Sequence, residues 1–210
     1  MTPDPTTYTV LADSLVNCVI ERGNIRLTKV IAAGAFGAIL LAEQTAPYPS
    51  LVAVKCIIKP SPNASERDWH FLTRELHLHK TAQGHKGVVR LHRWFEEEGY
   101  VFIVMDYYKD GDLFGMITEK QMFVAQDEVI RDAMLQVIDA LMHLHSKGVY
   151  HRDLKPENIL CVDEGDRLHL AIADFGLATN EMVSQEWGVG STYYMSPGMH
   201  AFFSCDAGLD

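Results

Sequence analysis

Four polar residues in the last third of the chain have the types needed for phosphate and metal chemistry: Asp153, Lys155, Asn158 and Asp174. Carboxylate and amide oxygens are hard ligands that suit Mg²⁺, which usually binds through one or two carboxylates together with substrate phosphates. Asp153 follows Arg152, a cation that favours its ionised form, so Asp153 can act as a general base. Lys155 can neutralise charge that develops on a transferred phosphoryl group.

A β-hairpin is predicted to position these groups. Pro156 stops a helix, and the apolar run ILCV before DEGD is typical of a short strand. The sequence RLHLAIA then predicts a second strand that returns and ends next to Asp174. The hairpin therefore aims an amide and a carboxylate at one metal-phosphate site.

The motifs HRDLKPEN, from His151 to Asn158, and DFG, from Asp174 to Gly176, resemble the catalytic and metal-binding loops of the eukaryotic protein kinases. The Lys-Pro-Glu after HRDL resembles the serine/threonine branch, and the sequence of the first lobe resembles that of fungal signalling kinases. The resemblance covers 27–197. It implies a two-lobed α+β fold, with a β-rich N-lobe, a helical but incomplete C-lobe, and ATP with Mg²⁺. It assigns catalytic roles to Asp153, Lys155, Lys55 and Glu75, and Mg²⁺ binding to Asn158 and Asp174.

The first lobe is expected to carry the nucleotide. LTKVIAA and AILLAE are predicted strands around a turn from Gly34 to Gly37, and LVAVKCII is a third strand that contains Lys55. The turn follows the kinase pattern G-x-G-x-x-G, except that Ala32 replaces the first glycine. Glycines let backbone amides approach phosphate oxygens. The sequence has no G-x-x-x-x-G-K-[ST], which disfavours a P-loop NTPase.

A helix from Ser65 to about Gln83 is predicted, with Glu75 resembling the kinase glutamate that pairs with the β3 lysine. Two further strands, VVRLHRWF and YVFIVMDYY, are predicted around the turn EEEG. The second resembles the kinase strand that leads into the linker whose backbone pairs with adenine. The resemblance thus gives a nucleotide-binding set of Ile31, Gly34, Phe36, Gly37, Ile39, Ala53, Lys55, Met105, Asp106, Tyr108, Asp112 and Leu160.

The second lobe contains the clearest helix of the sequence, QDEVIRDAMLQVIDALMHLHSKG, after a short helix that begins at DGDLFGMI. One apolar stripe is predicted to face the core. It comprises Val129, Ile130, Ala133, Met134, Val137, Ile138, Leu141 and Leu144.

The stretch TNEMVSQEWGVGSTYYMSP resembles a kinase activation segment, and Arg152 supplies a cation that a phosphorylated hydroxyl in it could engage. Its hydroxyls include Thr179, Ser184, Ser191 and Thr192. The family closes this segment with Ala-Pro-Glu, whereas here the sequence is Ser196-Pro197-Gly198, followed only by MHAFFSCDAGLD. We therefore expect an intact ATP site joined to an unsupported peptide platform, and a poor enzyme.

Composition limits the classes of protein. The formal net charge is -10, which argues against nucleic acid or an anionic membrane as a partner. No apolar run reaches transmembrane length, the N-terminus lacks a signal-peptide pattern, and the four cysteines form no CxxC. These features predict a cytoplasmic or nuclear protein.

The expected organisation has a loose start from Met1 to Thr7, an unassigned stretch from Tyr8 to Ile25, and then the kinase-like lobes. The predicted domains are an N-terminal extension (1–26), an N-lobe (27–107), a partial C-lobe (108–197) and a divergent tail (198–210).

Two other functions remain open. A small-molecule kinase shares the Asp and Asn chemistry but is not expected to carry LKPE or GSTYYMSP, and a non-catalytic nucleotide-binding or scaffold protein could carry every catalytic residue. The preferred prediction is a protein kinase whose Ser/Thr sites are preceded by Arg. Asp112 and Glu157 match positions where kinases of that preference carry acidic side chains.

Overall fold

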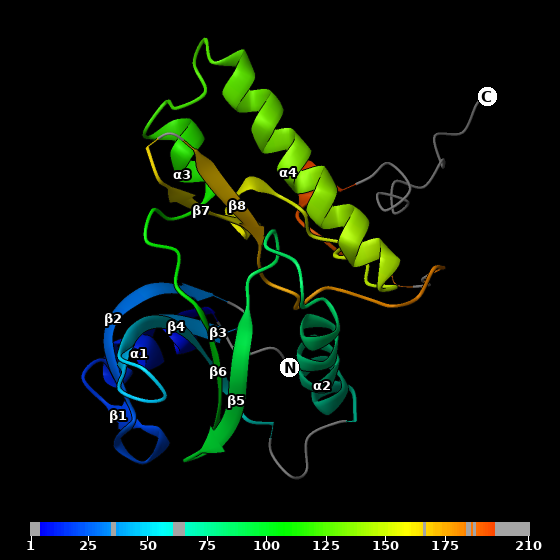
Figure 1. Ribbon diagram of the computed structural model, residues 1–210. Helices are drawn as coiled ribbons and strands as arrows, with labels where there is room; N and C mark the ends of the chain where they lie inside the picture. The colour runs from blue at the N-terminus through cyan, green and yellow to red at the C-terminus, as the bar shows by residue number, and fades with distance from the viewer. Residues whose placement is uncertain are drawn as a thin grey trace, which may run out of the picture. The chain divides into compact units, whose positions relative to one another are not determined.

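The computed structural model describes residues 5–34, 37–60, 66–165, 167–183, 186 and 188–195 (Figure 1). The chain forms two compact units, the first from 1–69 and 90–108 and the second from 70–89 and 109–210. Within the described ranges, no helix combines the length and the hydropathy needed to cross a bilayer.

The first unit is a six-stranded antiparallel sheet in the order β1-β2-β3-β4-β6-β5. The β5–β6 hairpin turns at Glu98 and Gly99, whose φ angles are 50° and 84°. Two successive positive φ angles match the right-handed twist of the flanking strands, so the turn closes a tight hairpin. The predicted strands of this region are therefore confirmed. The strands of the sheet are β1 (Val19–Ile20), β2 (Ile25–Gly34), β3 (Gly37–Gln44), β4 (Ser50–Ile58), β5 (Leu91–Glu97) and β6 (Tyr100–Asp106). Of these, β1 lies in the stretch left unassigned from the sequence.

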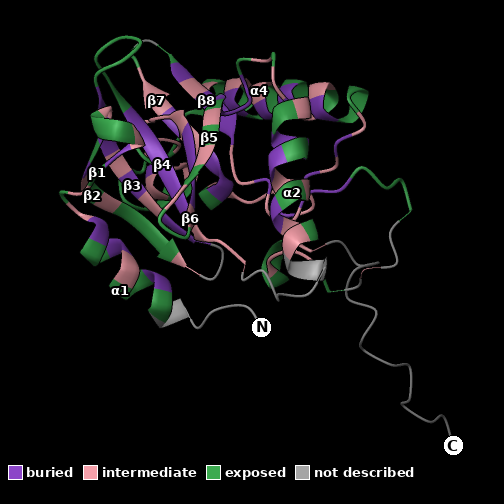
Figure 2. Cartoon of the chain, turned by 90° about the horizontal axis from the view of Figure 1, so that it is seen from below, coloured by how far each residue is buried: buried purple, intermediate pink, exposed green. Residues whose placement is uncertain are grey.

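A helix, α1 (Pro5–Leu15), precedes the sheet and packs on it. Proline is favoured at the start of a helix because its missing N–H has no helical partner there. Tyr8, Ala12 and Leu15 are buried at helical spacing, and the Tyr8 hydroxyl accepts a hydrogen bond from the Ile58 amide at 3.3 Å. Figure 2 shows buried and exposed residues alternating along α1. The expectation of a loose start is therefore wrong from Pro5 onward.

The second unit combines helices with a small hairpin. α2 (Glu66–Thr81) enters it from His70, and α3 (Leu113–Thr118), α4 (Asp127–Ser146) and the antiparallel strands β7 (Ile159–Asp163) and β8 (Leu168–Ile172) follow. The hairpin is the one predicted from the sequence. The end of β8 is fixed by two backbone bonds, from the Val89 amide to the Ile172 carbonyl (3.0 Å) and from the Ile172 amide to the Gly87 carbonyl (2.9 Å).

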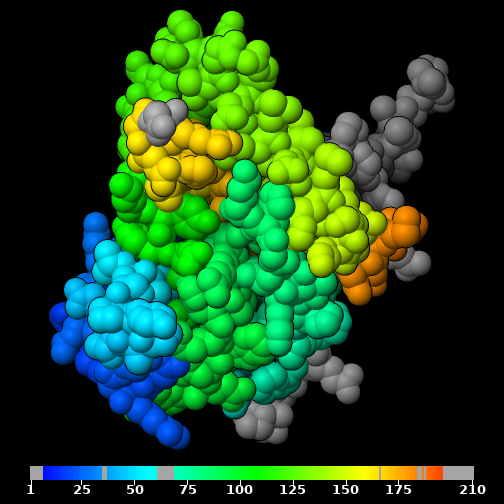
Figure 3. Space-filling model, viewed as in Figure 1, coloured from blue at the N-terminus to red at the C-terminus, as the bar shows by residue number. Residues whose placement is uncertain are grey.

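The apolar stripe of α4 is only half buried. Ala133, Val137 and Leu144 lie in the core of the second unit, and Ala140, which was not assigned to the stripe, is buried with them. Val129 and Leu141 are partly buried, but the prediction was wrong for Ile130, Met134 and Ile138, which are 41%, 56% and 47% exposed. The space-filling view shows side chains of α4 on the surface (Figure 3).

Candidate functional site

The loop before β7 draws three of the predicted site residues together. Asn158 donates from Nδ2 to the Asp153 carbonyl oxygen at 2.9 Å and to Asp153 Oδ2 at 3.0 Å. Lys155 Nζ lies 3.1 Å from the same Oδ2. Asp153 and Asn158 are each 8% exposed, so the carboxylate is held by an amide and a cation in a largely buried setting.

Ser191, which lies in the segment after the DFG motif, also contacts this group. Its amide donates to Asp153 Oδ1 at 2.8 Å, and Lys155 Nζ donates to its hydroxyl at 2.7 Å. Both carboxylate oxygens of Asp153 are thereby oriented. Sequence reasoning named Ser191 only as a hydroxyl that could be phosphorylated and missed this contact, because it joins residues far apart in the chain.

Asp174 lies beside Asn158 because of the hairpin register. Ile159 pairs with Ile172, and the Ala173 amide donates to the Asn158 carbonyl at 2.9 Å. Asp174 has a φ of 60°, and its Oδ1 accepts a bond from the Gly176 amide at 3.3 Å. The hairpin therefore presents the amide and the carboxylate from adjacent positions.

Glu75 of α2 reaches the same segment. A Cβ added to Gly176 would lie 3.3 Å from Asp174 Oδ1 and 3.7 Å from Glu75 Oε2. Two carboxylates that converge around one glycine repel each other unless cations lie nearby. This part of the second unit therefore favours positively charged ligands or side chains.

Phe175 is clamped between two histidines. Its ring stacks on His79 at 4.5 Å between centroids and meets His151 edge-on at 5.3 Å. Burial lowers the pKa of His151, so the imidazole is neutral near pH 7. One ring nitrogen can then accept from the Asp153 amide (3.3 Å) while the other donates to the Ala173 carbonyl (2.8 Å). His151 thus ties the loop that contains Asp153 to the segment that contains Asp174.

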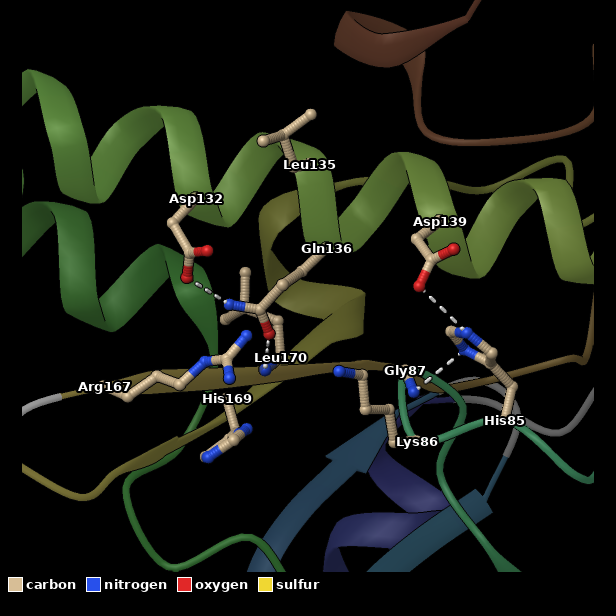
Figure 4. Close-up of a pocket in the computed structure, with 10 residues that line it drawn as sticks. All are labelled: His85, Lys86, Gly87, Asp132, Leu135, Gln136, Asp139, Arg167, His169 and Leu170. Atoms are coloured by element: carbon tan, nitrogen blue, oxygen red, sulfur yellow. Dashed lines mark hydrogen bonds and ion pairs between the residues drawn. The ribbon is translucent and has the colours of Figure 1, made fainter.

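The other face of the hairpin is held by α4. Gln136 donates to the Leu168 carbonyl at 2.7 Å and accepts from the Leu170 amide at 3.2 Å. Gln136 also donates to Asp132 at 2.8 Å, and both residues line a pocket of about 270 Å³, whose lining is drawn in Figure 4. None of the predicted catalytic or metal-binding residues lines this pocket, so its contribution to the site is the anchoring of β8.

The first unit holds the predicted phosphate-binding lysine. Lys55 lies on β4 opposite Ile39 and Ile103, and only 5% of it is exposed. Gly37 has a φ of 139°, and a Cβ there would lie 2.8 Å from the Cys56 carbonyl oxygen. Glycine is therefore required at this position by backbone packing as well as by any phosphate. Phe36 lies outside the described residues, and no described residue other than its chain neighbours comes within 4 Å of a Cβ added to Gly34.

The predicted adenine linker has some of its groups already engaged. The Asp106 amide donates to the Arg90 carbonyl at 3.0 Å, and the Asp106 carboxylate lies 2.7 Å from His92 Nε2. The Asp106 amide is therefore not available to adenine. Burial, together with the Asp106 charge, raises the pKa of Tyr108 to about 12, so its hydroxyl stays protonated.

The remaining members of the predicted nucleotide set fall on both units. In the first unit, Ala53 is buried and pairs with Met105 across β4 and β6, whereas Ile31 is 46% exposed. In the second unit, Asp112 forms a bridge with Leu160 and caps α3 by accepting a hydrogen bond from the Gly115 amide at 2.9 Å.

Comparison with known proteins decides the family. The protein kinase domain profile matches residues 25–200. The chain belongs to the protein kinase domain family. The α+β kinase fold class expected from the motifs is thereby confirmed, with a sheet-based first unit and a helical second unit.

Relatives of this kinase domain include fungal serine/threonine kinases. The "Negative regulator of sexual conjugation and meiosis" of Schizosaccharomyces pombe is 41% identical over 174 residues, which are 83% of this chain and 36% of that protein. The serine/threonine-protein kinase ksp1 of the same yeast is 33% identical, covering 85% of this chain and 38% of its own length. The serine/threonine-protein kinase SKS1 of Saccharomyces cerevisiae is 39% identical, and the match covers 70% of this chain and 28% of that protein. The chain thus spans well under half the length of these relatives.

The activation segment of the kinase domain is described in part. Ser196, Pro197 and Gly198, where the sequence departs from Ala-Pro-Glu, lie outside the described residues, as does Ser184. Thr179 is 2% exposed and exchanges two backbone hydrogen bonds with Tyr150. The segment is therefore fixed at Thr179 and again at Ser191.

Proposed function

We propose that this chain transfers the γ-phosphoryl group of ATP to a Ser or Thr hydroxyl of a protein substrate. The observation that carries the proposal is the set of contacts around Asp153, whose two carboxylate oxygens are oriented by Asn158, Lys155 and Ser191. A carboxylate with both oxygens fixed is placed for one proton transfer, and placement supplies most of the catalysis in phosphoryl transfer.

In the proposed reaction, Asp153 orients the acceptor hydroxyl and takes its proton. The hydroxyl oxygen forms a bond to the γ-phosphorus, the bond from that phosphorus to the β,γ-bridging oxygen breaks, and ADP leaves. Lys155, beside Asp153, stabilises negative charge on the transferred group. By resemblance to the family, Lys55 and Glu75 position the ATP phosphates.

The donor set of the second unit fits Mg²⁺. Asp174 offers carboxylate oxygens, and Asn158 commits its Nδ2 to Asp153, which leaves its Oδ1 as the atom able to bind a cation. The converging carboxylates of Asp174 and Glu75 add negative potential at the same place. Mg²⁺ bound there would neutralise charge on the phosphates during transfer.

Calorimetric titration with a non-hydrolysable ATP analogue tests the nucleotide site. We expect Mg²⁺-dependent binding that Lys55→Met weakens about 10- to 100-fold, because a charge-assisted hydrogen bond contributes roughly 1.5–3 kcal/mol. Asp174→Ala should instead remove the dependence on Mg²⁺. Equal affinity of wild type and Lys55→Met would exclude Lys55 from the phosphate site.

We also propose that the substrate carries Arg upstream of the acceptor. Glu157 is exposed, and the net charge is -10, whereas the Asp112 carboxylate caps α3 and is partly engaged. The preference therefore rests mainly on Glu157. On a peptide array, Glu157→Gln should weaken the preference for Arg about two- to fivefold, since an exposed ion pair contributes roughly 0.2–1 kcal/mol. Glu119→Gln, at another exposed glutamate, is the control. A wild-type preference for acidic upstream residues would contradict the proposal.

A second candidate function is a nucleotide-binding scaffold with little transfer activity. The exposed apolar side chains of α4 favour it, because a helix that leaves apolar surface uncovered supports the activation segment less firmly. Kinase activity abolished by Asp153→Ala would exclude this candidate. For either function, we propose a cytoplasmic or nuclear location on the composition alone.

A further inference from the structure

Glu186, in the activation segment, accepts two guanidinium groups at once. Arg152 Nη2 lies 2.8 Å from its Oε2, and Arg74 Nη1 lies 3.5 Å from its Oε1. Each carboxylate oxygen therefore faces a different arginine. The side chains of Arg152 and Arg74 are only 10% and 14% exposed, whereas that of Glu186 is 39% exposed.

The two arginines need an anion at this position. Like charges brought together in a partly buried setting repel each other, and a carboxylate placed between them offsets that cost. The hydrogen bond from Arg152, and then the charge of Arg74, hold the pKa of Glu186 below its usual value, so the carboxylate is ionised at neutral pH. Arg152 is fixed further by a hydrogen bond from its Nε to the Leu177 carbonyl at 2.7 Å.

Each arginine precedes a residue of the proposed catalytic set. Arg74 is followed by Glu75 on α2, and Arg152 is followed by Asp153 in the catalytic loop. A group that joins the two guanidiniums therefore fixes α2 and the catalytic loop to the activation segment. A phosphorylated hydroxyl was expected to engage Arg152, yet a carboxylate of the chain itself is found there.

Two hydroxyls of the segment are already engaged, whereas Thr192 is exposed and Ser184 lies outside the described residues. Thr179 is buried, and the Ser191 hydroxyl accepts a hydrogen bond from Lys155. Gly190 lies so close to the catalytic loop that a Cβ there would be 2.7 Å from the Arg152 carbonyl oxygen. The segment thus lies against Arg152 at Glu186 and again at Gly190.

We propose that Glu186 is a positioning residue for phosphoryl transfer, whose carboxylate fills the anion site of Arg74 and Arg152 and orders the activation segment without phosphorylation. The proposal rests on the kinase activity proposed above. In this proposal, Glu186 does not contact the substrate and acts through Arg74 and Arg152.

The experiment compares wild type, Glu186→Gln and Glu186→Asp in the full 210-residue chain, with Glu181→Gln as a matched control. Glu181 is an exposed glutamate of the same segment for which no ion pair is found among the described residues. The first readout is hydrogen exchange of backbone amides in 188–195, which includes the Ser191 amide, with β3 and β4 as the internal standard. We expect faster exchange in Glu186→Gln, partial rescue in Glu186→Asp, and wild-type exchange in Glu181→Gln.

The second readout is kinase activity after phosphatase treatment. Wild type and Glu181→Gln should keep their turnover when dephosphorylated, and Glu186→Gln should lose about 10- to 100-fold in kcat, as for a misplaced catalytic group, with Mg²⁺-ATP affinity retained. Wild-type exchange in Glu186→Gln, or loss of wild-type turnover on dephosphorylation, would overturn the proposal. If wild type matches Asp153→Ala in turnover, the proposed kinase function fails, and the exchange comparison alone still decides the role of Glu186.

Discussion

Replacing Asp153 by asparagine is expected to lower the kcat of phosphoryl transfer by about 100- to 10,000-fold, the usual contribution of a general base. The asparagine side chain has nearly the same shape but only one acceptor oxygen, so it can serve either the Ser191 amide or the pair Lys155 and Asn158. The amide also cannot take the proton of the acceptor hydroxyl. Mg²⁺-ATP binding should be retained because Asn158 and Asp174 are unchanged. Steady-state kinetics on a basic protein substrate, with calorimetry for nucleotide binding, checks both parts.

Ser191 provides the internal comparison for this result. Ser191→Thr keeps a hydroxyl for Lys155 and should stay near wild type, whereas Ser191→Ala removes that acceptor but leaves the amide that bonds Asp153. Activity should therefore fall in the order wild type, Ser191→Thr, Ser191→Ala, Asp153→Asn. Residual activity of Asp153→Asn equal to that of Ser191→Ala would remove Asp153 from the role of base.

Short motifs predicted the local part of this site. The spacing of Asp153, Asn158 and Asp174 specifies a loop, a short strand and its return, and local hydrogen bonds then settle the geometry. The strand containing Lys55 was equally clear because apolar residues flank the lysine on both sides and one of its two neighbours in the sheet, β3, directly precedes it in the sequence.

Contacts between distant segments were not predictable in the same way. Glu186 is one acid among many in the sequence, and only the fold brings it to Arg74 and Arg152. α1 was missed because its β-branched residues favour strands, while burial of Tyr8 and Ala12 against the sheet determines the helix. The error on α4 has the same origin, since an apolar stripe does not reveal how much of it other segments cover.

The exposed apolar face of α4 is expected to cause self-association of the chain. Ile130, Met134, Ile138 and Met142 are all at least 41% exposed, and they follow one another at helical spacing. Full burial of such a side chain contributes roughly 1.5–3 kcal/mol, so covering several of them gives a strong drive to associate. We expect the 210-residue chain to self-associate with rising concentration, and Met134→Lys combined with Ile138→Lys to abolish this.

Sedimentation velocity over a concentration series measures this effect, and charge provides the control. Each added lysine makes the net charge of -10 less negative, so weaker repulsion alone would increase association, whereas loss of apolar surface decreases it. Glu128→Gln changes the charge in the same direction at an exposed site of the same helix and should not reduce association. Thermal unfolding must remain cooperative in the double variant, because Met134 and Ile138 are largely outside the core. A double variant that associates as strongly as wild type would show that this face of α4 does not drive the self-association.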